Sequence, residues 1–284
     1  MKLGYNTNGL GCHRPDDALR LLAATGYRSV ALTVDHNWLD PYADSFPEQL
    51  LHIGELLAEL QFGCVIETGA RFLLDPRVKH EPTLISPGVE GRARRVDFLC
   101  RCIDIAASLD ADAVSFWAGV LHEDISYAAA RQRLVEGCRE VADYADTRSV
   151  RLAFEPEPGM LIETFDQFAE LAEKVNAPHF GLTVDIGHVQ CVEPRPIADY
   201  LRQWSAQIYN IHIEDMCRGV HEHLRFGEGE IDFPPVLRAL YEFGYSGGLH
   251  VELSRHSHMA PQVVGESYEF LNGLLATIDE SRAD

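Results

Sequence analysis

Residues 208–233 have the sequence IYNIHIEDMCRGVHEHLRFGEGEIDF, in which a buried strand pattern leads directly into a polar loop. The segment IYNIHI is short, apolar and rich in isoleucine, which is typical of a strand buried on both faces of a parallel sheet. Inside this strand, the polar ring of His212 needs a hydrogen-bonding partner or a ligand. The loop that follows adds His221 and His223. We therefore expect a functional site where this strand ends.

The same strand pattern recurs along the chain and alternates with helical patterns. Strands are predicted at residues 2–6, 29–35, 63–69, 112–119, 150–159, 180–188, 208–213 and 248–254, and helices at 15–25, 47–60, 92–109, 127–146, 165–175, 197–205, 235–243 and 261–278. Eight is the number of strand–helix units at which a parallel sheet closes into a barrel. The sequence therefore predicts an α/β fold, a single (β/α)8 TIM barrel over residues 1–284.

An open, doubly wound sheet is the alternative fold. No G-x-G-x-x-G or Walker loop follows any predicted strand, which disfavours that alternative. Three longer loops are predicted to act as lids or binding loops, at about residues 35–47, 70–91 and 215–232.

The net charge of −20 restricts the class of partner. A surface this acidic repels phosphate backbones and anionic lipids, so we expect neither nucleic acid nor a membrane as a partner. The first residues contain no apolar segment of signal-peptide length, and the sequence has no run of about 20 apolar residues. The seven cysteines are scattered, as expected for thiols in a reducing compartment. We expect a soluble, cytoplasmic protein.

Four potential metal ligands follow or end successive strands in the second half of the chain. These are Glu155, Asp185, His212 and Glu252. The active site of a TIM barrel lies at the carboxyl ends of its strands, so the four side chains are expected to meet there. Each alone would be an ordinary strand-end acid or core histidine, but together they suit one divalent ion such as Mn, Co, Mg or Zn.

Other polar and aromatic side chains near these strand ends are candidates for substrate contacts. His188 lies one turn beyond Asp185, and His221 and His223 form an H-x-H pair that is either a surface feature or, with His188, a second metal site. We also predict substrate contacts for Glu157, Trp117 and His36. For the tryptophan, simple packing under a lid is the alternative.

Several of these motifs resemble those of a known family. The segments LAFEPEPG, LTVDIGH, IHIED, HLRFGEGEIDF and HVELS are similar to those of the sugar phosphate isomerase/epimerase family, which belongs to the xylose isomerase-like TIM barrels. That group includes ketose 3-epimerases, inosose dehydratases and isomerases, and endonuclease IV. The resemblance implies the same four metal ligands, with Glu155 and Glu252 as the acid–base pair. It also implies substrate contacts by His188 and Arg218.

The resemblance implies proton abstraction next to the carbonyl of a keto-sugar or keto-cyclitol, through a metal-stabilised enediolate. The expected activity is an isomerase or epimerase acting on a small polyol. A metal-dependent lyase, such as an inosose-type dehydratase or a C-glycoside-cleaving enzyme, a hydrolase and a non-catalytic sugar-binding barrel are the alternatives. Glu67 and Trp117 stand where endonuclease IV-like members carry zinc-binding histidines, which argues against DNA cleavage. By analogy, a homodimer or homotetramer is expected.

Overall fold

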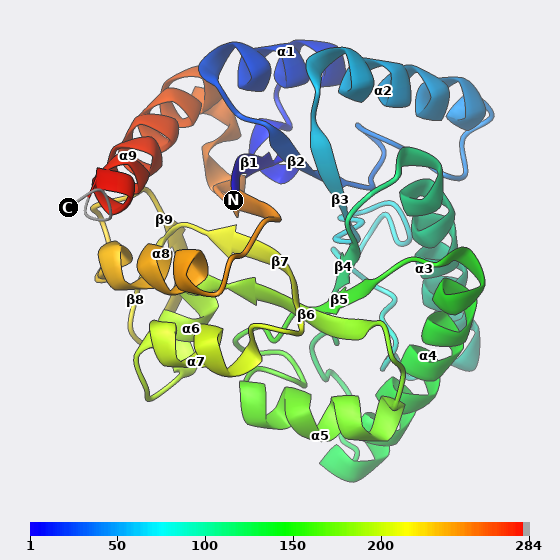
Figure 1. Ribbon diagram of the computed structural model, residues 1–284. Coiled ribbons are helices and arrows are strands. Elements are labelled where there is room, and N and C mark those ends of the chain that lie inside the picture. The colour runs from blue at the N-terminus through cyan, green and yellow to red at the C-terminus, as the bar shows by residue number, and fades with distance from the viewer. Residues whose placement is uncertain (281–284) are drawn as a thin grey trace.

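Eight parallel strands form a closed barrel in the computed structural model, which describes residues 1–280 (Figure 1). Around the barrel, β1 pairs with β10, and the order continues through β7, β6, β5, β4 and β3 to β2, which pairs with β1 again. The bounds are β1 (Lys2–Asn6), β2 (Ser29–Thr33), β3 (Gly63–Glu67), β4 (Val114–Phe116), β5 (Leu152–Phe154), β6 (Phe180–Asp185), β7 (Ile208–Ile213) and β10 (Gly248–Val251). The predicted (β/α)8 barrel is confirmed.

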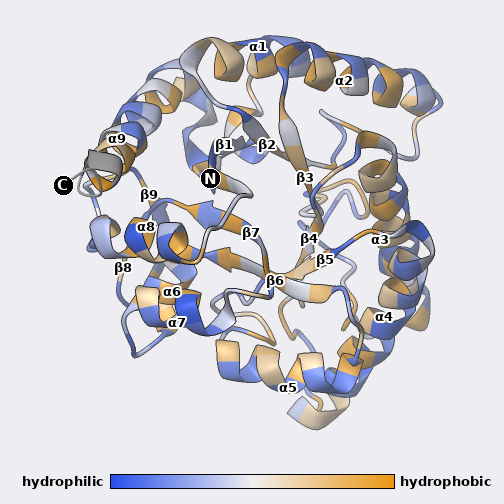
Figure 2. Ribbon diagram, viewed as in Figure 1, coloured by the Kyte–Doolittle hydropathy of each residue, from blue (hydrophilic) through white to orange (hydrophobic). Residues whose placement is uncertain are grey.

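Helices cover the outside of this barrel and connect its strands (Figure 1). They are α1 (Pro15–Thr25), α2 (Phe46–Leu60), α3 (Val89–Leu109), α4 (Tyr127–Arg148), α5 (Phe165–Val175), α6 (Ile186–Val192), α7 (Ile197–Trp204), α8 (Phe233–Glu242) and α9 (Ala260–Glu280). Hydrophobic and hydrophilic residues alternate along this ring of helices, as expected when one face of each helix packs on the strands (Figure 2). Polar side chains cap some of the helices. At the start of α5, for example, Thr164 and Gln167 form a capping box.

The segment predicted as a loop at residues 215–232 contains a β-hairpin instead. Its strands, β8 (Asp215–Cys217) and β9 (Val220–Leu224), pair antiparallel. The Asp215 carboxylate accepts hydrogen bonds from the backbone N–H groups of Met216, Gly227 and Ile231, at 3.0, 2.9 and 3.1 Å. A carboxylate therefore joins the start of the hairpin to the segment that follows its second strand.

A buried arginine binds the backbone of the segment at residues 70–91 and of the residues just before it. Arg95 on α3 is 3% exposed and donates to the carbonyl oxygens of Pro82, Thr68 and His80, at 2.7, 3.1 and 2.5 Å. Three charge-assisted hydrogen bonds to one loop give it a fixed path. The loop therefore has a defined conformation.

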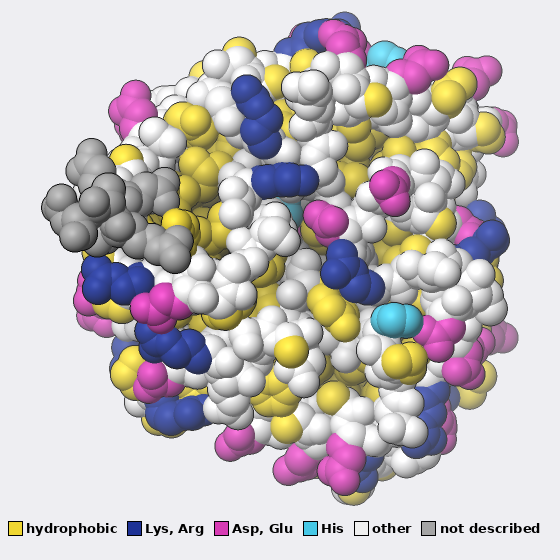
Figure 3. Space-filling model, viewed as in Figure 1, with side chains coloured by type: hydrophobic (Ala, Val, Ile, Leu, Met, Phe, Trp, Pro, Cys, Tyr) yellow, Lys and Arg dark blue, Asp and Glu magenta, His cyan; other side chains and the backbone are white. Residues whose placement is uncertain are grey.

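Two short 3-10 helices lie beside each other at the same end of the barrel, η1 (Thr7–Leu10) and η2 (Ser254–Met259). The final strand was predicted to run to residue 254 but ends at Val251, shortly before η2 begins. Figure 3 shows a face of the molecule on which acidic, basic and hydrophobic side chains are interspersed. Among residues 1–280, no helix is both long enough and apolar enough to cross a membrane.

Candidate active site

A cavity of about 470 Å³ lies at the carboxyl ends of the barrel strands. Its walls include residues from the ends of seven strands: Asn6, Thr33, Glu67, Trp117, Glu155, His212 and Glu252. Glu157, His188, His221 and His223, which were also predicted to form part of the site, line the same cavity. Its size is typical of sites for small molecules.

The four predicted metal ligands come together at the base of this cavity: Glu155, His212 and Glu252 line it, and Asp185 lies buried beside them. Glu155, Asp185, His212 and Glu252 each offer a ligand atom, and these atoms lie within 4.8 Å of one another. Nδ1 of His212 is 2.8 Å from Glu252 Oε2, 3.0 Å from Glu155 Oε1 and 3.9 Å from Asp185 Oδ2. One imidazole nitrogen thus faces three carboxylates.

The opposite nitrogen of His212 contacts a fourth carboxylate, that of Glu67. Nε2 lies 2.8 Å from Glu67 Oε1; in a ring whose Nδ1 binds a metal ion, the proton stays on Nε2 and is donated to that oxygen. Asn210 donates from Nδ2 to the same Glu67 oxygen at 3.0 Å. A histidine whose remote nitrogen donates to a carboxylate is oriented as metal-binding histidines are.

This polar chain continues through the barrel interior to its amino-terminal end. His250 donates from Nδ1 to Asn210 Oδ1 at 2.8 Å, and its Nε2 lies 2.8 Å from Ser29 Oγ, which donates to it. Burial lowers the pKa of His250 to about 3, so the ring is neutral. Every member of the chain has a partner, which fixes Asn210 and hence His212.

Burial and close packing shift the proton affinities of the floor residues in opposite directions. Burial raises the pKa of Glu155 to about 7, against the opposing effect of His212. Burial alone would lower the pKa of His212, but the carboxylates of Glu67, Glu252 and Glu155 raise it well above its ordinary value. Burial would raise the pKa of Glu252, but His212 brings it below its usual range.

Asp185 is nearly fully buried, and its two oxygens differ. Oδ1 accepts from the backbone N–H of His188 at 2.8 Å and so caps α6. Within the described residues, Oδ2 has no hydrogen-bond partner. A buried carboxylate oxygen without a partner is costly unless a cation lies beside it. The donor set, one imidazole and three carboxylates, therefore fits a divalent ion.

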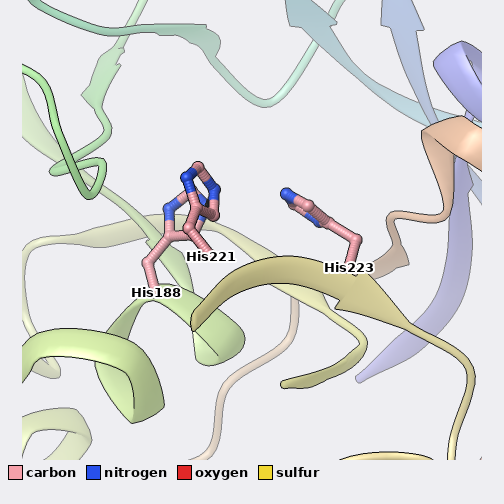
Figure 4. Close-up of side chains that lie close together, drawn as sticks. All are labelled: His188, His221 and His223. Carbon is pink, nitrogen blue, oxygen red and sulfur yellow. Dashed lines mark hydrogen bonds between the residues drawn. The ribbon is translucent and has the colours of Figure 1, made fainter. Parts of the chain in front are cut away.

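Three histidines form a second cluster beside the floor residues (Figure 4). His188 comes from α6, and His221 and His223 come from β9. The Nε2 atoms of His188 and His221 are 3.0 Å apart, and the ring of His223 points toward the other two in Figure 4. Burial lowers the pKa of His188 to about 3, so the imidazole is neutral and one of its nitrogens can coordinate a metal ion.

Glu214 lies next to His223. It is fully buried, and within residues 1–280 neither of its carboxylate oxygens has a hydrogen-bond partner. Its Oε1 is 3.6 Å from Nδ1 of His223. Asp185, Glu214 and His223 also offer ligand atoms within 4.8 Å of one another.

Two of the predicted substrate contacts do not lie at the cavity. β2 ends at Thr33, and the next turn is closed by the Asp35 carboxylate, which leaves His36 exposed and outside the cavity. Arg218 is exposed at the turn between β8 and β9, where its guanidinium donates to the carbonyl of Glu193 at 2.8 Å. Neither side chain lines the site. Trp117 does, with its ring 5.4 Å from that of His80.

The sequence interpretation missed four residues that complete the site: Asn210, Glu214, His250 and Asn8. Asn210, His212 and Glu214 are spaced by two residues, so one alternation along β7 places all three on the same side of the strand. His250 and Glu252 show the same spacing at β10. Asn8 donates to Glu252 Oε1 at 2.7 Å from η1, and no pattern in the sequence indicated this contact.

Comparison with known proteins agrees with this architecture. Residues 19–274 match the family model described as xylose isomerase-like TIM barrel. The L-ribulose-5-phosphate 3-epimerase UlaE of Salmonella paratyphi A is 25% identical over 162 residues, which are 57% of each chain. The matches span about half the length of the first curated relatives.

Two solved structures show the same fold over nearly the whole chain. An L-ribulose 3-epimerase superimposes with a TM-score of 0.78 at 19% identity, covering 99% of this chain and 97% of the other. A structure of the IolI protein with a bound zinc atom has a TM-score of 0.76 at 20% identity, with coverages of 98% and 99%.

Proposed function

This chain belongs to the xylose isomerase-like TIM barrel family, and on that premise we propose that it is a divalent-metal-dependent isomerase or epimerase of a keto-sugar or keto-cyclitol. One observation carries the proposal: Nδ1 of His212 faces the carboxylates of Glu155, Asp185 and Glu252, and three of these four residues, all but Asp185, line a cavity of about 470 Å³. The epimerases among the relatives and the zinc in IolI support this reading.

Glu155, Asp185, His212 and Glu252 are the residues that would hold the ion. Mn, Co, Mg and Zn all accept such a donor set. When bound there, a divalent ion would polarise the substrate carbonyl and favour the enediolate that follows deprotonation.

Glu155 and Glu252 have the positions of an acid–base pair. Glu155 follows β5 and Glu252 follows β10, so the strands that carry Asp185 and His212 lie between them in the barrel. One glutamate would remove the proton from the carbon next to the carbonyl, and the other would return a proton to the opposite face, which inverts that centre. Return of the proton to the neighbouring carbon would give isomerisation instead.

Asn8 and Trp117 would position the substrate over this pair. Asn8 holds Glu252 Oε1 through a hydrogen bond of 2.7 Å and so fixes the direction in which that carboxylate faces the cavity. Trp117 adds an aromatic wall against which an apolar sugar face can pack. Glu157 lines the same cavity as a further hydrogen-bonding group.

A second divalent ion would be held by His188, His221 and His223. Nitrogen atoms 3.0 Å apart, as in His188 and His221, are at the separation of two ligands of one metal ion with bonds of about 2.1 Å. The fully buried Glu214 lies next to His223 without a hydrogen-bond partner among the described residues, and a cation there would compensate its charge. Metal content of the His221→Gln variant tests this: loss of one ion of two supports the site, and unchanged stoichiometry contradicts it.

The main experiment combines a substrate panel with the Glu155→Gln variant. The wild type, loaded with Mn, Co, Mg or Zn, is incubated with free and phosphorylated ketoses and with keto-cyclitols in deuterium oxide. Products are then identified by NMR. An epimer or aldose isomer labelled at the exchanged carbon supports the proposal. A dehydrated product shows a lyase, and a Glu155→Gln variant with normal turnover refutes the acid–base assignment.

A further inference from the structure

Three cationic side chains line the candidate active-site cavity, although acidic residues outnumber basic ones by 44 to 24 in the chain. Arg71 and Lys79 lie in the segment between β3 and α3, and Arg255 lies in η2. Ser254 and Ser257, which flank Arg255 in η2, line the cavity as well. These residues come from the loops after β3 and β10, and the histidine cluster comes from the loops after β6 and β7.

We call Arg71, Lys79 and Arg255 the cationic wall of the cavity. From it we infer that the cavity contains a subsite for an anionic group of the substrate, a phosphate monoester or a carboxylate. Arginine, lysine and hydroxyl groups together are the donors that bind such groups. A neutral polyol would need hydrogen-bond donors and acceptors but no group of cations. The inference rests on the proposed function only in making the anion part of the substrate.

Arg71 is fixed in a conformation that faces the cavity. Its Nη2 donates to the Asn8 carbonyl oxygen at 2.7 Å, and its Nε is 3.6 Å from the buried Asp35 carboxylate. Backbone φ angles of +54° at Ala70 and +49° at Arg71 place two successive residues in the left-handed region, which is unfavourable for both. The surrounding structure keeps this strain, as is common where a side chain must be held at a binding site.

The other two cations are available to a ligand. Within residues 1–280, the ammonium group of Lys79 forms neither a hydrogen bond nor an ion pair, although the residue lines the cavity. Arg255 forms an ion pair of 2.9 Å with Glu222, in which the two side chains are 63% and 47% exposed. Exposed pairs of this kind contribute little, so an entering anion can replace Glu222 as the partner of Arg255.

The known relatives differ in whether their substrates carry a phosphate. For this chain, the evidence must therefore come from its own residues. The UlaE relatives are named for a 5-phosphate substrate, whereas the structural neighbour is named for L-ribulose without a phosphate. The cationic wall favours a phosphorylated substrate. The metal-binding floor and the cationic wall would then hold opposite ends of one substrate.

The first experiment measures anion binding without any assumption about turnover. Inorganic phosphate and acetate are titrated by calorimetry into the metal-loaded wild type and into Lys79→Gln and Arg255→Gln, at constant ionic strength. Lys174→Gln on α5 and Arg238→Gln on α8, both exposed, are matched controls for the loss of one charge. We expect each cavity variant to weaken the preferred anion by about tenfold and each control by less than about twofold.

The titrations decide between the two chemical sources and can overturn the proposal. Tighter binding of phosphate than of acetate assigns a phosphate monoester, and the reverse assigns a carboxylate. A wild type that binds neither anion, or cavity variants that behave as the controls do, refutes the subsite.

Turnover separates failure of the subsite from failure of the proposed function. For a phosphorylated ketose, Lys79→Gln should lower kcat/KM more than it does for the unphosphorylated ketose. If the wild type turns over no ketose but the cavity variants still lose anion binding, the subsite stands and the proposed reaction is wrong. If the titrations assign a phosphate, equal losses of kcat/KM for both ketoses refute the subsite and leave the reaction intact.

Discussion

Replacing Glu155 with glutamine should stabilise the metal-free protein at pH 8. Burial raises the pKa of Glu155 to about 7 from its ordinary value of 4.5, a net result that already includes the attraction of His212. Between these two pH values the folded protein keeps a proton that the unfolded chain has released, so its free energy of unfolding falls as the pH rises. The difference between 4.5 and 7 corresponds to about 3 kcal/mol, which is fully developed above pH 7. Glutamine keeps the shape of the side chain without this loss.

The assay is urea denaturation of chelator-treated protein at pH 5 and pH 8. Glu155→Gln should exceed the wild type by about 3 kcal/mol at pH 8 and by much less at pH 5. Adding Mn or Zn at about 100 times its dissociation constant should stabilise the wild type by about 2.7 kcal/mol and leave the variant nearly unchanged. Glu173→Gln, at an exposed position of α5, is the control and should follow the wild type. A variant that is less stable than the wild type at pH 8, or equally stabilised by the ion, would refute this reasoning.

Three further predictions concern residues that support the site. Asn210→Ala removes the hydrogen bonds that link His250 to Glu67, and should weaken divalent-ion binding by about 10- to 100-fold in calorimetry. Gly4→Ala would place a Cβ 2.3 Å from the ring of His250 and should cost about 1–3 kcal/mol in urea denaturation, whereas Gly273→Ala in α9, with open space around it, should stabilise. Arg95→Met removes two hydrogen bonds to the 70–91 segment and a third to Thr68 just before it, and should raise amide hydrogen exchange in the segment while lowering substrate affinity.

Each of these three predictions has a result that contradicts it. An unchanged ion affinity in Asn210→Ala would mean that Glu67 alone orients His212. A Gly4→Ala protein as stable as the wild type would show that the His250 ring moves without cost. Unaltered exchange in the 70–91 segment of Arg95→Met would show that other contacts hold this wall.

The fold was predictable because its evidence is local. Each strand is a short apolar run and each helix has its own periodicity and caps, so eight units can be counted without knowing any contact between them. The four residues on the floor of the cavity were predictable for the same reason. Once the barrel is accepted, a side chain at the end of a parallel strand has only one rim to lie on.

Contacts between distant parts of the chain were not predictable from single-sequence patterns. Glu67 and His212 are separated by 145 residues, and Asn8 and Glu252 by 244, so nothing local records their pairing. His36 was placed at the cavity because it follows a strand, but the turn after β2 directs it to solvent. The hairpin of β8 and β9 was taken for a loop because its strands are only three and five residues long.

The Asp215 carboxylate links the start of the β8–β9 hairpin to the segment that follows it, so this insertion and the barrel tolerate change differently. The strands β5, β6, β7 and β10 must keep their register, because a shift in any one of them displaces a proposed metal ligand. The hairpin, by contrast, starts and ends on a single carboxylate and pairs only with itself in the ladder. Exchange of this hairpin would leave Glu155, Asp185, His212 and Glu252 in place but would replace His221 and His223, and with them the proposed second metal site.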